Sequence, residues 1–179
     1  TETSGYVYVS QVRAGLPAPV AGCMWLTLGP AATGCFAPVY CGTSEIAESW
    51  RRPPDFTRIA RTGVQWKFQL VEDLVGLKYQ EAIEDVRKVF GPAEERFFRL
   101  QPELEDAAVQ VWKDQGAAGA ERFVTAYSNS CMEKVDEAYG ELVDFLMFKY
   151  LYSYSSAAPP SLPRIGAVAV PPPGSGNRN

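Results

Sequence analysis

The sequence contains no histidine among its 179 residues. A Ser-His-Asp triad, a Cys-His pair and a His-ligated zinc site are therefore excluded within this chain, because each needs an imidazole. The four cysteines show no Cys-x-x-Cys spacing, and we expect neither a metal nor a cofactor. Cys23, Cys35 and Cys41 lie in apolar runs that are typical of strands. We expect these three thiols to be buried and all four, including Cys131, to be reduced, which favours a reducing compartment.

The sequence also lacks an excess of basic residues, a segment that resembles a signal peptide, and a long apolar run. The net charge is −4 and the isoelectric point is about 5.0, which argues against a nucleic-acid-binding surface. The densest basic cluster, within residues 51–61, lies among prolines and is interpreted as a solvated linker. No apolar run is long enough to span a bilayer. Nothing resembles a signal peptide, but Thr1 is compatible with an excision point, so the compartment stays open.

Residues 5–42 have the alternation of three consecutive strands. The second strand, residues 21–28, is apolar on both faces, so we expect both faces to be covered. A five-residue hairpin loop leads to the third strand, residues 35–41, and this loop length places Cys23 opposite about Val39. The predicted sheet is thus a three-stranded meander.

Residues 43–62 are predicted to form a loop, and residues 63–152 have the 3.6-residue period of helices. Gly91-Pro92 predicts a helix end, and Pro102 predicts a kink. Residues 116–119 predict a break, and the capping-box spacing of residues 130–133 predicts the start of a last helix. The fold class is therefore α+β, with three strands followed only by helices. A sheet that is apolar on both faces needs a further layer, so this architecture is incomplete.

The tail, residues 153–179, is rich in Pro, Ser, Ala and Gly. Its composition favours an extended, polyproline-like segment without a core of its own. Such a tail, if ordered, is held either by this domain's own surface or by a partner. Recognition by a Pro-binding domain is an alternative.

Five short motifs follow one another through the strand region: Gln11-Val12-Arg13, Leu16-Pro17, Gly22-Cys23-Met24-Trp25, Pro38-Val39-Tyr40-Cys41-Gly42 and Thr43-Ser44-Glu45. In this order they resemble the C-terminal part of the dipeptidase A family of cysteine peptidases, to which the secernins also belong. The helical stretch "LVGLKYQEAIEDVRKVFGPAEERFFRLQPELEDAAVQVW" resembles the family's helix pair, and "FLMFKY" resembles its closing helix. The resemblance covers roughly residues 5–152.

This resemblance implies a partial N-terminal nucleophile hydrolase fold whose first half is missing from this chain. In that class the side chain of the first residue attacks the substrate, and its own α-amino group acts as the base, so no histidine is needed. The resemblance implies that the cysteine nucleophile lies in the absent half. It therefore implies no catalytic residue in this chain. Thr1 differs from the family's nucleophile segment and is not expected to be the nucleophile.

Arg13 ends a strand just before a turn, and Gln11 shares its strand face. Both are candidates for a pocket, and a surface position remains the alternative for each. Tyr40 belongs either to the core or to that pocket. The acidic clusters at residues 94–95 and 103–106 are interpreted as solvated helix faces.

Two functions follow from the sequence. The first is the C-terminal portion of a dipeptidase-like cysteine hydrolase, completed by the N-terminal half of the fold or by another protein chain. The second is a non-catalytic accessory subunit of a larger complex that retains the scaffold. In both cases we expect Met24, Leu26, Phe36 and Tyr40 to be mostly buried, some of them by residues outside this chain.

Overall fold

The structure is a computed structural model that describes residues 5–55, 57–152, 158 and 160–172. Three strands form one antiparallel sheet in the order β1-β2-β3, with β1 at Tyr6–Val12, β2 at Gly22–Leu28 and β3 at Ala37–Tyr40. A short helix, α1 (Ala18–Ala21), precedes β2, and α2 (Glu48–Arg51), α3 (Val64–Leu77) and α4 (Tyr79–Leu151) follow β3. The α+β class and the three-stranded meander are confirmed. The predicted loop over residues 43–62 contains α2, a helix that the sequence pattern did not predict.

The pairing of β2 with β3 differs from the predicted register by one residue. Cys23 lies opposite Tyr40, and Met24 lies opposite Val39. The cause is the connection between the strands, which is longer than a five-residue loop. Cys35 donates its backbone N–H to the Tyr139 hydroxyl at 3.0 Å, and Phe36 donates its N–H to the Glu94 carboxylate at 2.8 Å. These two residues therefore bond to α4 rather than to the ladder.

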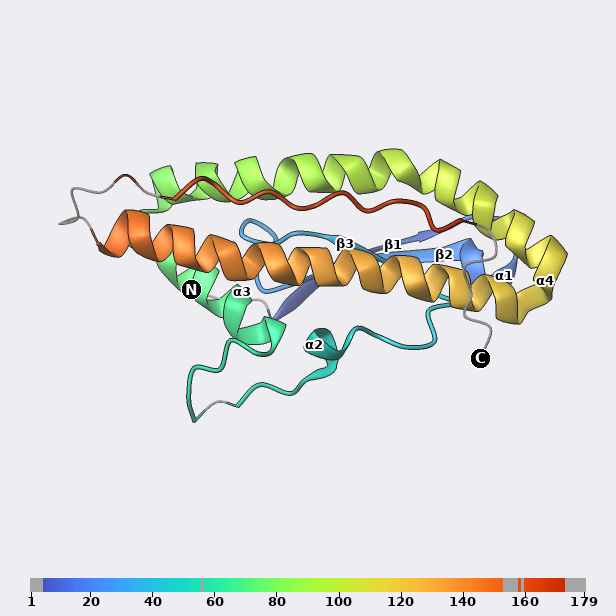
Figure 1. Cartoon of the computed structure of the whole chain (residues 1–179), viewed down its shortest axis with the longest axis horizontal. Coiled ribbons are helices and arrows are strands. Elements are labelled where there is room, and N and C mark those ends of the chain that lie inside the picture. The colour runs from blue at the N-terminus through green and yellow to red at the C-terminus, as the bar shows by residue number, and fades with distance from the viewer. Residues whose placement is uncertain (1–4, 56, 153–157, 159, 173–179) are drawn as a thin grey trace.

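Helix α4 is a hairpin of two antiparallel arms, which we call the first arm (residues 79–115) and the second arm (residues 117–151). Gly116 separates them with a φ of 72° and a ψ of −168°, and the chain reverses there (Figure 1). The predicted break is confirmed. The helix end predicted at Gly91-Pro92 is wrong, and so is the helix start predicted at residues 130–133, because α4 runs through both.

Burial explains why the first arm continues through its two prolines. A proline removes one backbone hydrogen bond from a helix, a local cost that packing can offset. Phe90 and Ala93 flank Pro92 and are each 2% exposed, and Leu104 beyond Pro102 is fully buried. Since the apolar face continues across both prolines, tertiary packing overrides the local stop signal.

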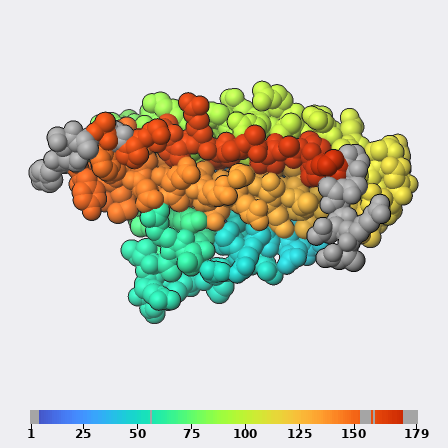
Figure 2. Space-filling view, in the orientation of Figure 1, coloured from blue at the N-terminus to red at the C-terminus, as the bar shows by residue number. Residues whose placement is uncertain are grey.

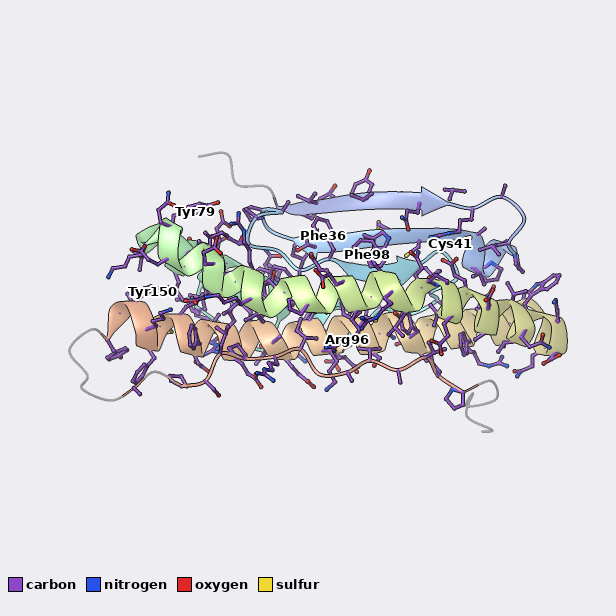
Figure 3. The ribbon with its side chains drawn as sticks, turned by 90° about the horizontal axis from the view of Figure 1, so that it is seen from above. Phe36, Cys41, Tyr79, Arg96, Phe98 and Tyr150 are labelled. Atoms are coloured by element: carbon purple, nitrogen blue, oxygen red, sulfur yellow. The ribbon has the colours of Figure 1, made fainter. Side chains whose placement is uncertain are left out.

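The core lies between the sheet and the arms of α4. The ring of Trp25 stacks on Phe98 of the first arm at 4.0 Å between centroids. Tyr139 of the second arm lies 3.9 Å from Phe68 of α3 and 4.6 Å from Phe90. Figure 3 shows β1 as the strand farthest from α4, with Phe98 directed toward the sheet.

The opposite face of the sheet, which we call the open face, is only partly covered. Along β2, Cys23, Trp25 and Thr27 are buried, whereas Met24, Leu26 and Leu28 are half-buried. Of the four residues expected to be mostly buried, only Tyr40 is buried by this chain, and Phe36 is half-buried. On β1, Tyr6 and Val12 are 62% and 83% exposed. The described residues of this chain therefore cover one face of β2 fully and the other only in part, and the cover expected from outside this chain stays a prediction.

The tail returns along the outside of the α4 hairpin. Residues 160–172 run between the two arms (Figure 1) and fill a line along the molecular surface (Figure 2). The tail is therefore held by this domain's own surface, one of the two predicted alternatives. The rest of residues 153–179, apart from residue 158, lies outside the described residues.

Within the described part of the chain, none of the helices combines the length and the apolar character that crossing a membrane requires.

Candidate functional site

Gln11 is the centre of a polar cluster between β1 and the first arm. Its Oε1 atom accepts hydrogen bonds from Trp25 Nε1 at 2.9 Å, Gln101 Nε2 at 3.1 Å and Arg13 Nη2 at 3.2 Å. Gln11 pairs with Cys23 across the ladder, so its side chain lies on the face of the sheet that α4 covers. One amide oxygen therefore connects β1, β2 and the first arm.

Arg13 extends this cluster to two further residues. Its Nη1 atom lies 3.0 Å from Glu105 Oε1, and the Tyr40 hydroxyl donates to the same carboxylate oxygen at 3.1 Å. Nη1 is buried and makes the ion pair without an aligned hydrogen bond. The Glu105 side chain is 9% exposed, whereas that of Arg13 is 32% exposed. The structure thus brings the two predicted candidates, Gln11 and Arg13, together and fixes the guanidinium at the edge of the solvent.

Helix α4 contributes partners to this cluster that were not predicted from the sequence. Glu94 and Glu105 were both interpreted as parts of solvated helix faces. Glu105 is instead buried, and Glu94 is half-buried and accepts a hydrogen bond from the Phe36 N–H. Burial raises the pKa of the Glu94 carboxyl. Gln101 and Glu105 could have been found from their spacing, because they fall one turn apart on the stripe that carries Phe97 and Ala108.

The phenol and thiols beside this cluster are held in their neutral forms. Burial, assisted by the Glu105 carboxylate, raises the pKa of Cys23 to about 12, and burial raises the pKa of Tyr40 further above its ordinary value. Burial also raises the pKa of Cys131 to about 12 and that of Cys35 well above 9.0. Since the thiolate is the nucleophile, these three thiols are inert near neutral pH.

Cys41 differs from the other cysteines, because it is exposed on the open face. Gly22 donates its N–H to the sulfur at 3.3 Å, and the thiol donates to the Ala18 carbonyl at 2.8 Å. It borders an apolar hollow of about 310 Å³ that Val12, Met24 and Val39 also line. The prediction of a buried Cys41 is wrong, because a cross-strand neighbour without a side chain, Gly22, leaves its thiol uncovered. All four cysteines are free, as expected.

The cluster can orient a charged group, but it holds no nucleophile paired with a base. Thr1 lies outside the described residues. Arg13 has five N–H donors, and its two assigned contacts leave donors for a substrate or for a neighbouring catalytic residue. Within residues 5–55, 57–152, 158 and 160–172, no group of three potential metal-ligating side chains is assembled.

The model of peptidase family C69 matches residues 1–91 of the 179. The chain belongs to peptidase family C69. The matched segment carries Gln11, Arg13 and Tyr40, and it ends before Gln101 and Glu105, which lie farther along the first arm. The C69 segment thus supplies the guanidinium of the cluster, and the rest of the chain supplies the carboxylate that holds it. No curated protein and no solved structure matches the chain significantly.

Proposed function

We propose that this C69 chain is the C-terminal portion of a dipeptidase-like cysteine hydrolase of the N-terminal nucleophile class, whose cysteine nucleophile comes from a segment outside this sequence. The observation that carries the proposal is the guanidinium of Arg13, held by Glu105 and Gln11 at the end of β1. A pre-positioned, partly exposed guanidinium binds a carboxylate or an oxyanion with good geometry. In the proposed enzyme, Arg13 orients either the substrate carboxylate or the N-terminal cysteine.

The protonation states of the cysteines support an external nucleophile. Cys23, Cys35 and Cys131 are buried, and each has a raised pKa. Cys41 is exposed, but it lies on the open face, whereas Gln11 and Tyr40 lie on the face toward α4. The three buried thiols are therefore not nucleophilic near neutral pH, and the exposed one lies on the face of the sheet opposite the Arg13 cluster.

The uncovered part of the sheet supports completion by further strands. Tyr6, Tyr8 and Val12 are more than half exposed, and β1 is an edge strand without charge or proline. Such an edge is a template for pairing, and covering each of these side chains contributes about 1.5–3 kcal/mol. We propose that the N-terminal half of the fold, or another protein chain, supplies those strands.

The test combines this chain with the nucleophile-bearing N-terminal segment of a C69 peptidase and measures dipeptide hydrolysis. Arg13→Lys is expected to lower kcat/KM by about 10–100-fold, the loss for one charge-assisted hydrogen bond. Arg99→Lys is the matched control, because Arg99 is exposed on the first arm. Full activity of the Arg13→Lys enzyme contradicts the assigned role of Arg13. A folded complex that lacks all hydrolysis favours the second candidate, a non-catalytic accessory subunit of a larger complex.

A further inference from the structure

A hollow of about 400 Å³ lies between the first arm of α4 and the tail, and we call it the basic hollow. Lys88 and Arg96 line it from the first arm, and Arg164 lines it from the tail. None of its described lining residues is acidic. Three cationic side chains therefore converge on one hollow of a chain whose net charge is −4.

The carboxylates of the described residues leave these three charges largely unpaired. Lys88 Nζ lies 4.0 Å from Asp85, whose carboxylate is held more closely by Lys149 at 2.5 Å. The ion pairs of the described residues include neither Arg96 nor Arg164. Placing like charges around one hollow costs free energy, because they repel one another, and an anion bound between them would recover that cost.

The tail orients the guanidinium of Arg96. The Nη1 atom donates to the carbonyl oxygens of Ile165 and Gly166, each at 3.3 Å, and the side chain is half-buried. A guanidinium has five N–H donors, so these two contacts leave donors for a ligand. Its planar fork matches the paired oxygens of a phosphate group, and its orientation is already fixed before a ligand binds.

Apolar side chains complete the lining of the basic hollow. Val89, Ala93 and Ile165 are buried and border it together with the three cations. An apolar wall with a few convergent charged groups is typical of sites for small organic ligands. The lining therefore suits a molecule that carries its negative charge at one end and has an apolar part at the other.

We propose that the basic hollow binds a small organic phosphate, namely a phosphate monoester whose dianion is held by the three cations and whose apolar part packs on the buried side chains. The tail stays in place in this complex and contributes Arg164. Arg96 lies on the side of α4 next to the tail, whereas Phe98 is directed toward the sheet, so the basic hollow is separate from the cluster around Arg13 (Figure 3). The negative net charge favours a soluble source of the phosphate over an anionic membrane surface.

The test is isothermal titration calorimetry of the full chain with phenyl phosphate at about pH 7.5, where the monoester is mostly a dianion. We expect saturable binding that inorganic phosphate competes for and that phenol does not reproduce. Lys88→Gln and Arg164→Gln are each expected to weaken binding by about 10–100-fold, the loss for one charge-assisted hydrogen bond. Both side chains are exposed, and circular dichroism checks that the variants fold.

Arg87→Gln is the matched control, because it removes the same charge one residue from Lys88. Arg87 borders a different hollow, beside Gly34 and Phe90, so this change should weaken binding by less than about threefold. Glu141→Gln is expected to strengthen binding, because Glu141 lines the adjacent hollow that Lys88 also borders.

Two results would overturn the proposal: no saturable binding of phenyl phosphate by the wild type, or equal weakening by Arg87→Gln and Lys88→Gln. The second result would show that net charge alone sets the affinity. Binding to vesicles that contain phosphatidic acid, without binding of phenyl phosphate, would overturn the soluble ligand and assign the same phosphate chemistry to a lipid headgroup.

Discussion

The carboxylate of Glu105 lies 3.0 Å from the guanidinium of Arg13, and this contact joins the C69 segment to the part of α4 beyond it. The Tyr40 hydroxyl donates to the same oxygen. Neutralising Glu105 thus leaves Arg13 without its counter-ion. Because the Arg13 side chain is about a third exposed, water recovers part of its solvation, and the loss is smaller than for a fully buried pair.

Glu105→Gln is expected to lower the free energy of unfolding by about 1–3 kcal/mol. Urea denaturation measures the change. Glu103→Gln is the control, because Glu103 lies about half a turn earlier on the same helix and is exposed. This substitution should change the free energy of unfolding by less than about 0.5 kcal/mol. Equal effects of the two substitutions would contradict the assigned ion pair.

Gly116→Ala is expected to destabilise the chain by about 1–3 kcal/mol, because a φ of 72° with a ψ of −168° is open only to glycine. Gly91→Ala serves as the opposite case. Gly91 is helical, and an added Cβ meets nothing within 4 Å, so this substitution should stabilise by about 0.5–1 kcal/mol. Thermal or urea unfolding of both variants tests the pair; stabilisation by Gly116→Ala would refute the two-arm geometry.

A thiol reagent is expected to modify one equivalent of cysteine rapidly in the native protein and three more only on unfolding. Cys41 is the exposed thiol, whereas Cys23, Cys35 and Cys131 are buried. Cys41→Ser should abolish the rapid phase and leave the slow one. Rapid labelling of Cys23 would show that the sheet is more open than described.

Stability is expected to fall as the pH rises above about 9. Burial raises the pKa of Cys23 and Cys131 from 9.0 to about 12 in the folded state, so the unfolded chain loses these protons first. The stabilising contribution is therefore complete below pH 9 and decreases toward pH 12, by about 1.4 kcal/mol per pH unit for each thiol. Urea denaturation between pH 7 and 11 measures it, and Cys131→Ala should reduce the slope. A slope that is unchanged in Cys131→Ala would count against this cause.

The sequence predicted the elements that depend on local pattern, and it failed where distant contacts decide. The alternation of β1 and the break at Gly116 follow from side-chain period and glycine freedom, and both are present. The predicted register between β2 and β3 was wrong, because Cys35 and Phe36 bond to α4 and the connection between the two strands is therefore longer than the predicted five-residue loop. A hairpin loop length alone does not contain that information.

The cluster around Arg13 could be predicted only in part, for the same reason. Gln11 and Arg13 were named as candidates from their position at a strand end, and their role in a pocket stays a prediction; their partners Gln101 and Glu105 were not named. Charge suggested a solvated face for Glu105, while its place on the apolar stripe of the first arm determines its burial. Here the helical period is a better guide than residue type.

Under the proposed function, this chain positions a peptidase site whose nucleophile comes from another segment. The most direct measurement is dipeptide hydrolysis by the purified, folded chain alone. We predict no hydrolysis above the uncatalysed rate, and hydrolysis once the N-terminal cysteine segment is added. Activity of the isolated chain that disappears in Thr1→Ala, yet survives replacement of Cys23, Cys35, Cys41 and Cys131 together, would contradict the claim and identify Thr1 as the nucleophile.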